Sequence, residues 1–150
     1  MSRETVAKGQ GSFSSYDLNI IAADRIFFSG FCESMIIPAY DGQKEILAHH
    51  EAMLIAVEEG LMRYRPAGSE KWQEAVVGKG FVQIFNNRVT LLVETAERPE
   101  EIDVARAREA KERAEEQLRQ KQSIQEYYHT SASLARAMSR LKAAGKIRAQ

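Results

Sequence analysis

The chain has 150 residues, 44% of them hydrophobic, and its 21 Lys and Arg balance its 21 Asp and Glu to a formal net charge of zero. This length suits one domain or two small ones, and the composition is that of an ordinary globular protein. Zero net charge gives no reason to expect nucleic acid or an anionic membrane as a partner. Cys32 is the only cysteine, which excludes an internal disulfide and a cysteine-ligated zinc site and favours a reducing compartment.

The first residues are rich in Ser and Gly, and Val6 and Phe13 are their only sizeable apolar side chains. We expect residues 1–15 to form a flexible leader. No stretch approaches the ~20 apolar residues that span a bilayer, and the N-terminus lacks the pattern of a signal peptide. We therefore expect membrane association only through a partner.

From Tyr16 to about Thr95 the sequence pattern is typical of a β domain. Short apolar runs alternate with turn signals, which is typical of a sandwich or barrel. Asn86-Asn87 predicts a tight hairpin, because Asn tolerates the positive φ that such turns require. The predicted strands cover Tyr16–Ala22, Ile26–Phe31, Cys32–Ala39, Ala52–Val57, Leu61–Arg65, Trp72–Val77, Phe81–Phe85 and Val89–Val93.

After Arg98 the pattern becomes helical. Pro99 suits a first helical position and two glutamates follow it, so we expect a helix from Pro99 to about Gln122. A second helix should begin near Ser123, which is a plausible cap or break, run to about Ala144 and stop at Gly145. A stripe of small residues on the first helix should meet an apolar face on the second: Ala107, Ala110, Ala114 and Leu118 against Leu134, Met138 and Leu141.

Charged residues at helical spacing are the most specific feature of the chain. Asp103, Arg106 and Arg113 share one side of the first helix, and Arg136 and Arg140 share one side of the second. From Ser123 onward the chain has five basic residues against Glu126 alone. Two such helices folded together could gather a carboxylate and several guanidiniums around a small anion. Composition alone favours the alternative, a solvated face stabilised by i,i+4 pairs.

Other candidate chemistry is weak. His49-His50 lacks the partners that would complete a metal site, and Cys32 on an apolar strand is typical of core packing. No nucleophile-elbow, zinc-protease or phosphate-loop motif is present, so we assign no catalytic residue and no metal ligand.

The β region followed by TAERPEEIDVARAREAKERAEEQL resembles the epsilon subunit of F-type ATP synthase, from about Tyr16 to Lys142. The most specific parts are VTLLVETAE at Val89–Glu97, I-D-x-x-R-A at Ile102–Ala107 and RAMSRL at Arg136–Leu141. The resemblance implies an α+β chain. An N-terminal antiparallel β-sandwich of about ten strands, residues 16–97, would be followed by an antiparallel two-helix hairpin, residues 98–150.

The resemblance also implies a function. The family subunit is not a catalyst: it lies in the rotor, its sandwich binds the gamma subunit and the ring of c subunits, and it couples proton flow to ATP synthesis. Its hairpin is compact or extends along gamma into the alpha/beta catalytic head and inhibits ATP hydrolysis. No cofactor is required, but some members bind regulatory ATP. That site carried over to this chain comprises Glu97, Asp103, Arg106, Arg113, Arg136 and Arg140.

The family approaches the c ring through a loop that corresponds to residues 41–50. The candidate contacts are Asp41, Gly42, Gln43, Glu45 and His50. The chain departs from the family pattern here, because Glu45 replaces a glycine, Ala48 a proline and His49 a glycine. Lys79 also replaces one glycine of a Gly-Gly pair.

Two other functions remain open from the residues themselves. One is a generic interaction module, in which a sandwich presents a basic hairpin to an unrelated partner. The other, nucleic-acid binding through the second helix, is disfavoured because the rest of the chain is slightly acidic and Tyr127-Tyr128 is a poor stacking platform. The resemblance implies that the protein lies on the cytoplasmic face of a bacterial plasma membrane, with a plastid thylakoid as the alternative.

Overall fold

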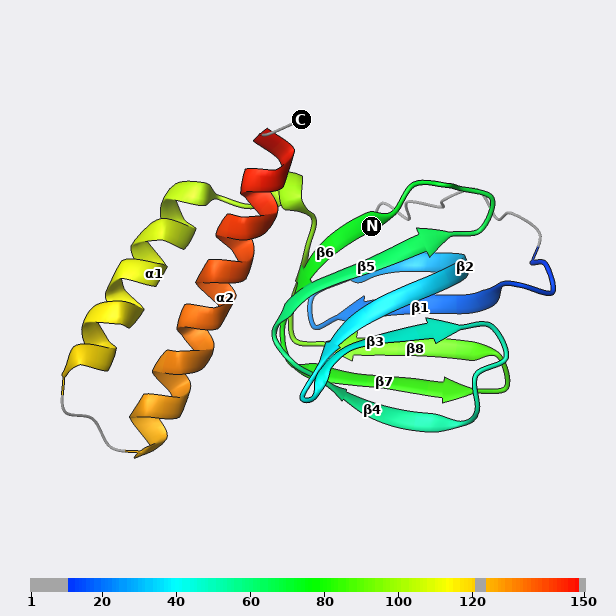
Figure 1. Ribbon diagram of the computed structural model, residues 1–150, viewed down its shortest axis with the longest axis horizontal. Coiled ribbons are helices and arrows are strands. Elements are labelled where there is room, and N and C mark those ends of the chain that lie inside the picture. The colour runs from blue at the N-terminus through cyan, green and yellow to red at the C-terminus, as the bar shows by residue number, and fades with distance from the viewer. Residues whose placement is uncertain (1–10, 121–123, 149–150) are drawn as a thin grey trace. The chain divides into compact units, whose positions relative to one another are not determined.

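The computed structural model describes residues 11–120 and 124–148, so the leader expected at 1–10 and the break expected at Ser123 lie outside the described residues. The chain forms two compact units, and the boundary between them lies between Ala96 and Glu97. The first is built of strands and the second of helices (Figure 1). No helix among the described residues is both long enough and apolar enough to cross a membrane.

Nine strands occur between residues 11 and 97, close to the expected ten. They are β1 (Tyr16–Ala22), β2 (Ile26–Ala39), β3 (Gly42–Leu47), β4 (Met53–Val57), β5 (Gly60–Pro66), β6 (Gln73–Val77), β7 (Gly80–Phe85), β8 (Arg88–Val93) and β9 (Ala96–Glu97). Their order in the sheet is β4-β7-β8-β1-β2-β5-β6-β9, and β3 pairs separately with β2.

The long strand β2 connects the two layers of the sandwich. Its first half pairs with β1, with Phe28 opposite Ile20. Its second half pairs with β3 and β5, and the register with β5 shifts between Cys32 and Ser34. We expected two strands over this stretch, but the chain turns from one layer to the other by this irregularity and keeps a single strand.

The sheet is mixed, which corrects the expectation of an all-antiparallel sandwich. β1 and β8 run parallel, with Leu18 opposite Val89 and Ala22 opposite Val93. The Asn86-Asn87 hairpin is confirmed: the two residues have φ of 52° and 59° and join antiparallel β7 and β8. A parallel pair needs a long connection, and here the whole of β2 to β7 provides it.

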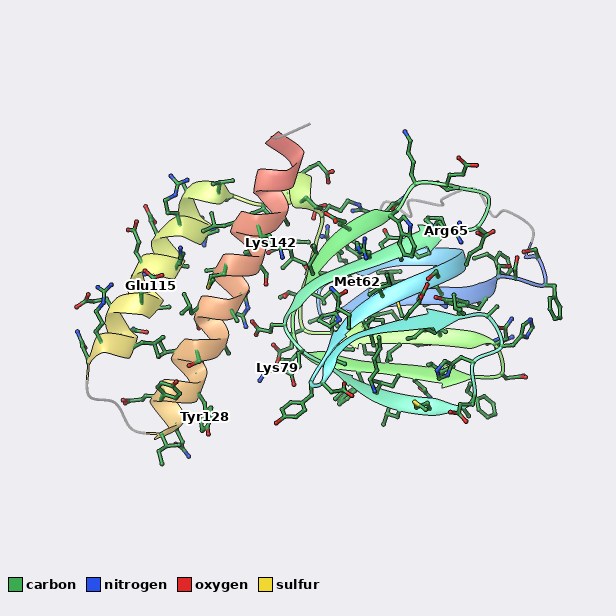
Figure 2. All side chains as sticks on the ribbon, in the orientation of Figure 1. Met62, Arg65, Lys79, Glu115, Tyr128 and Lys142 are labelled. Carbon is green, nitrogen blue, oxygen red and sulfur yellow. The ribbon has the colours of Figure 1, made fainter. Side chains whose placement is uncertain are left out.

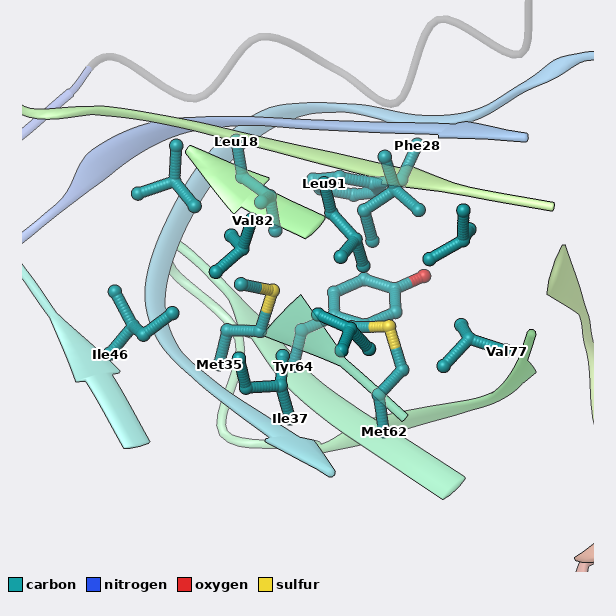
Figure 3. Close-up of a cluster of buried hydrophobic side chains, with 14 of the residues drawn as sticks. Leu18, Phe28, Met35, Ile37, Ile46, Met62, Tyr64, Val77, Val82 and Leu91 are labelled. Atoms are coloured by element: carbon teal, nitrogen blue, oxygen red, sulfur yellow. The ribbon is translucent and has the colours of Figure 1, made fainter. Parts of the chain in front are cut away.

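The core lies between the two layers. Alternate residues of β1 and β5 are buried, as the period of two requires. Figure 3 shows side chains of both layers meeting around Tyr64. Among the described residues of the whole sandwich, the largest side chains that are less than 2% exposed include Tyr16, Leu18, Ile20, Met35, Ile37, Ile46, Met62, Tyr64, Ile84 and Leu91.

The second unit begins with a short 3₁₀-helix, η1 (Pro99–Glu101), followed by α1 (Val104–Arg119) and α2 (Ile124–Arg148). The first α-helix therefore starts later than expected, because Asp103 is extended and caps it. Gly145 lies inside α2 and does not end it, which corrects the expected stop. Gly145 is exposed, and a single glycine costs a helix only about 1 kcal/mol, which is not enough to end it.

Candidate functional site

Small residues form the seam between α1 and α2. Ala107 and Ala114 of α1 and Ala137 of α2 are each 3% exposed or less. Thr130 Oγ1 lies 3.5 Å from Gln117 Oε1, so the end of α1 meets the beginning of α2 and the helices are antiparallel. Met138 was expected in this seam but is 51% exposed.

Glu97 and Arg140 form a two-pronged ion pair within the helical unit. Arg140 Nε donates to Glu97 Oε2 at 2.8 Å, and Nη2 donates to Oε1 at 2.7 Å. The side chain of Arg140 is only 25% exposed, and that of Glu97 is 30% exposed. Glu97 ends β9 and directly precedes η1, so the pair ties α2 to the segment that leads into α1.

Asp103 has a structural role that the sequence analysis did not predict. Its carboxylate accepts a hydrogen bond from the backbone N–H of Arg106 at 3.2 Å, which is an N-cap. One carboxylate oxygen is therefore committed to the helix terminus. Asp103 and the side chain of Arg106 are exposed to solvent.

The register of the hairpin places the four predicted arginines along one side. Counting from Gln117 and Thr130 at 1.5 Å per residue puts Arg106 beside Arg140 and Arg113 about 3 Å along the axis from Arg136. The four residues share a relation to the seam, because each directly precedes a seam position: Ala107, Ala114, Ala137 and Leu141. In an antiparallel pair, such positions flank the same side of the seam. Glu97 offsets one of these four positive charges.

The structure does not bring the predicted ring-contact residues together. Residues 42–47 form strand β3, which we had interpreted as a loop. Asp41 precedes β3 and His50 follows it, so a full strand of roughly 20 Å separates them. Glu45, between them, accepts a hydrogen bond from Ser34 at 2.7 Å. The exposed, mostly polar pattern of β3 hid the strand in the sequence.

A turn at residues 12–15 lies at the His49 end of β3. His49 Nε2 lies 2.7 Å from the carbonyl oxygen of Phe13, and the two rings are 4.6 Å apart. Asn87 Nδ2 donates to the carbonyl oxygen of Ser15 at 3.0 Å. This part of the expected leader is therefore fastened to the sandwich. No cluster of three potential metal ligands occurs within residues 11–120 and 124–148.

An apolar row on the outer face of the sandwich was missed by the sequence reasoning. Strand register aligns one apolar residue from each of five neighbouring strands, in the order Ala56, Phe81, Leu92, Ile21 and Ile26. Of these, Phe81, Leu92 and Ile26 are 53%, 42% and 69% exposed. Figure 1 shows β4, β7, β8 and β1 side by side in this layer.

The row borders an open hollow of about 580 Å³ with charged residues at its rim. Its lining includes Glu58, Glu94 and Lys79, which is labelled in Figure 2. A contiguous exposed apolar surface with a polar rim marks an interaction site. The signal in the sequence was Phe81 of β7 and Leu92 of β8, which are apolar at positions that face away from the core.

Among the residues that the structure describes, two titratable groups have raised pKa values, and both belong to the core. Burial raises the pKa of Cys32, although hydrogen bonds with Tyr16, Ser34 and Arg65 oppose the shift. Burial is also the main reason that the pKa of Tyr16 lies far above its ordinary value. Tyr16 Oη donates to the carbonyl oxygen of Ile46 at 2.9 Å. Neither group lies in the helical unit, so these shifts do not indicate acid–base chemistry at the arginine set.

Two family models match successive parts of the chain. Residues 15–99 match the ATP synthase delta/epsilon chain β-sandwich domain, and residues 100–145 match the long α-helix domain of the same chain. The sequence is 44% identical over 135 residues to an ATP synthase epsilon chain of Ruminiclostridium cellulolyticum, covering 90% of this chain and 99% of the relative. It is 41% identical over 133 residues to that of Caldanaerobacter subterraneus, covering 88% and 95%.

The fold is similar to chains of two solved assemblies. One is in the mitochondrial ATP synthase of Euglena gracilis, OSCP/F1/c-ring, with a TM-score of 0.75 at 22% identity, covering 91% of this chain and 85% of that chain. The other is in the Tetrahymena thermophila mitochondrial ATP synthase central stalk and c ring, with a TM-score of 0.61 at 13% identity, covering 85% and 95%.

Proposed function

Since this chain belongs to the ATP synthase delta/epsilon chain family, we propose that it is the epsilon subunit of a rotary ATP synthase. In this role it is a non-catalytic part of the central stalk, couples proton flow to ATP synthesis, and inhibits ATP hydrolysis through its hairpin. The observation that carries the proposal is the match to both family domains in order, over residues 15–145. The complex would hold it on the cytoplasmic face of a bacterial plasma membrane.

The outer apolar row supports binding of the gamma subunit by the sandwich. Without a partner, the side chains of Phe81, Leu92 and Ile26 remain exposed to water, which is unfavourable and suggests that another protein covers this face. Burying such a row against a partner removes apolar area from water, and the charged rim can fix the orientation. The ring of c subunits would contact β3 or the turns at its two ends.

Co-purification tests the assembly. The intact chain, with an affinity tag, is expressed together with the gamma subunit of a related bacterial enzyme. The proposal predicts a stable one-to-one complex that survives gel filtration. A tagged chain that elutes alone under these conditions, with both proteins folded, would contradict it and return the chain to the class of general interaction modules.

The hairpin geometry supports ATP as a regulatory ligand. Four guanidiniums along one side of the seam make a strongly positive strip, and planar guanidinium forks match phosphate oxygens. Glu97 uses two of the five N–H donors of Arg140, so three remain for another acceptor. Asp103 would accept from the adenine amino group or orient an arginine.

Calorimetric titration with ATP, with and without magnesium, tests this site on the isolated protein. We expect saturable binding that Arg106→Ala abolishes. Arg108→Ala is the matched control, because Arg108 is also exposed on α1 but flanks the opposite side of the seam. Absence of binding by the native chain at millimolar ATP would remove the nucleotide from the proposal and leave the assembly role intact.

Regulation would then follow from competition for the same side chains. In the compact hairpin Arg136 and Arg140 hold ATP, and in the extended hairpin they face acidic loops of the catalytic head. A ligand that binds only the compact state shifts the population towards it, so low ATP releases the inhibitor. An Arg136→Ala chain that retains both ATP binding and inhibition in the assembled enzyme would refute this competition.

A further inference from the structure

We infer that the Glu97–Arg140 ion pair is a latch that keeps the hairpin compact in the absence of any nucleotide. The inference rests on the proposed function only for its biological use, since the latch itself is a property of this chain. It assigns Glu97 a role that is separate from ligand binding. The hairpin would have an intrinsic closed state, which a nucleotide reinforces but does not create.

The geometry of the pair supports this role. Both bonds are charge-assisted and short, at 2.8 Å and 2.7 Å, and the carboxylate meets the guanidinium edge to edge. The side chains are about three-quarters removed from water, so the pair is screened less than a surface pair. It also joins positions 43 residues apart in sequence, so it constrains tertiary structure rather than one helical turn.

The remaining contacts between the helices make the pair important. The seam is built of alanines such as Ala107, Ala114 and Ala137, which bury little apolar area each. Helices of this kind gain little from packing, and so one specific ion pair can decide whether they stay together. The other ion pairs found in the described part of the unit join residues three or four apart and do not reach α2: Arg98–Glu101, Lys111–Glu115 and Arg119–Glu116.

Hydrogen exchange of the full chain in nucleotide-free buffer tests the latch. Glu97→Gln keeps the shape of the side chain and removes its charge. We expect backbone amides of α2 to exchange about tenfold faster or more, since a charged hydrogen-bonded pair is worth that much. Strand β1 provides the internal reference, because its exchange should not change. Glu116→Gln is the matched control and should leave α2 unchanged.

A charge reversal separates the latch from ligand binding. The double variant Glu97→Arg with Arg140→Glu restores an opposite-charge pair, so slow exchange of α2 should return towards the native rate. The same variant should not recover nucleotide binding, because a carboxylate now replaces one guanidinium of the strip. Unchanged exchange in Glu97→Gln, or no recovery in the double variant, would overturn the latch. Because no nucleotide is present, neither result depends on whether the chain binds ATP.

Discussion

The backbone N–H of His49 donates a 2.8 Å hydrogen bond to the side-chain Oδ1 of Asn87. The side-chain amide of Asn87 also donates a hydrogen bond, from Nδ2 to the carbonyl oxygen of Ser15 at 3.0 Å. One side chain in the β7–β8 turn thus joins the turn after β3 to the N-terminal turn. His49 and Asn87 both have positive φ, at 62° and 59°, so the contact fixes two turns that are sterically demanding.

Asn87→Ala should therefore destabilise the sandwich. We expect the free energy of unfolding to fall by about 1–3 kcal/mol, since two hydrogen bonds are lost and alanine is disfavoured at positive φ. Urea titration measures the change. Asn86→Gly is the control and should be tolerated, because Asn86 has φ of 52°, which glycine adopts readily. Equal stability of native and Asn87→Ala chains would contradict this account of the three turns.

Gly80 is required by the close pairing of β7 and β8. A Cβ at this position would clash with the backbone oxygen of Leu92. Because the clashing atom belongs to the backbone, no side-chain rotation can remove the clash. Gly80→Ala should lower the free energy of unfolding by about 2 kcal/mol or more, because overpacking forces the backbone apart. The midpoint of thermal unfolding reports the loss.

Gly145→Ala is the opposite case. Nothing lies within 4 Å of a Cβ at Gly145, and the residue is inside α2. Alanine should add about 0.5–1 kcal/mol of helix stability there. Loss of stability in Gly145→Ala, or no loss in Gly80→Ala, would show that these two backbone environments are described wrongly.

The apolar row should respond sharply to charge. Phe81→Glu places a carboxylate within the row. Binding of a partner over the row would then bury an unpaired charge, which is unfavourable. We expect binding of gamma to weaken at least about a hundredfold while the chain stays folded, because Phe81 is 53% exposed and not part of the core. Biolayer interferometry with immobilised gamma gives the affinity.

Gln125→Glu is the control for that experiment. It adds the same charge at an exposed position in the first turn of α2, where an acidic residue is compatible with the helix dipole. Its affinity for gamma should be native. If Phe81→Glu also binds gamma normally, the sandwich uses another face.

The buried thiol of Cys32 predicts a pH dependence. Burial raises the pKa of Cys32, so the folded chain keeps the thiol proton while the unfolded chain releases it above about pH 8.5. The stabilisation from Cys32 is complete below that pH and declines as pH rises towards the folded pKa. The difference in unfolding free energy between the native chain and Cys32→Ala should therefore narrow from pH 7 to pH 10. A constant difference would mean that the thiol titrates alike in both states.

Much of the fold could be predicted from local pattern. Strands such as β1 and β5 alternate cleanly, and Asn86-Asn87 specified its own turn. β3 was missed because Ile46 is its only buried residue and hydrogen bonding to β2 rather than burial makes it a strand. The parallel pairing of β1 with β8 depends on topology, which side-chain periodicity does not encode.

The candidate site was only partly accessible to sequence reasoning. Helical spacing indicates which arginines share a face of one helix, but the seam of α1 and α2 decides which faces meet. The direct contact of Glu97 with Arg140 spans 43 residues and three elements, so no spacing rule could find it. The apolar row was missed for the same reason, since strand register across five strands creates it.

The most direct test of the central claim is ATP hydrolysis by a bacterial ATP synthase core, lacking its own epsilon subunit, to which this chain is added. We expect the native chain to join the complex and to lower the rate of ATP hydrolysis, more strongly at low ATP. The Arg136→Ala chain should join equally and inhibit less. A native chain that fails to join, or that joins and leaves hydrolysis unchanged at every ATP concentration, would contradict the proposed role.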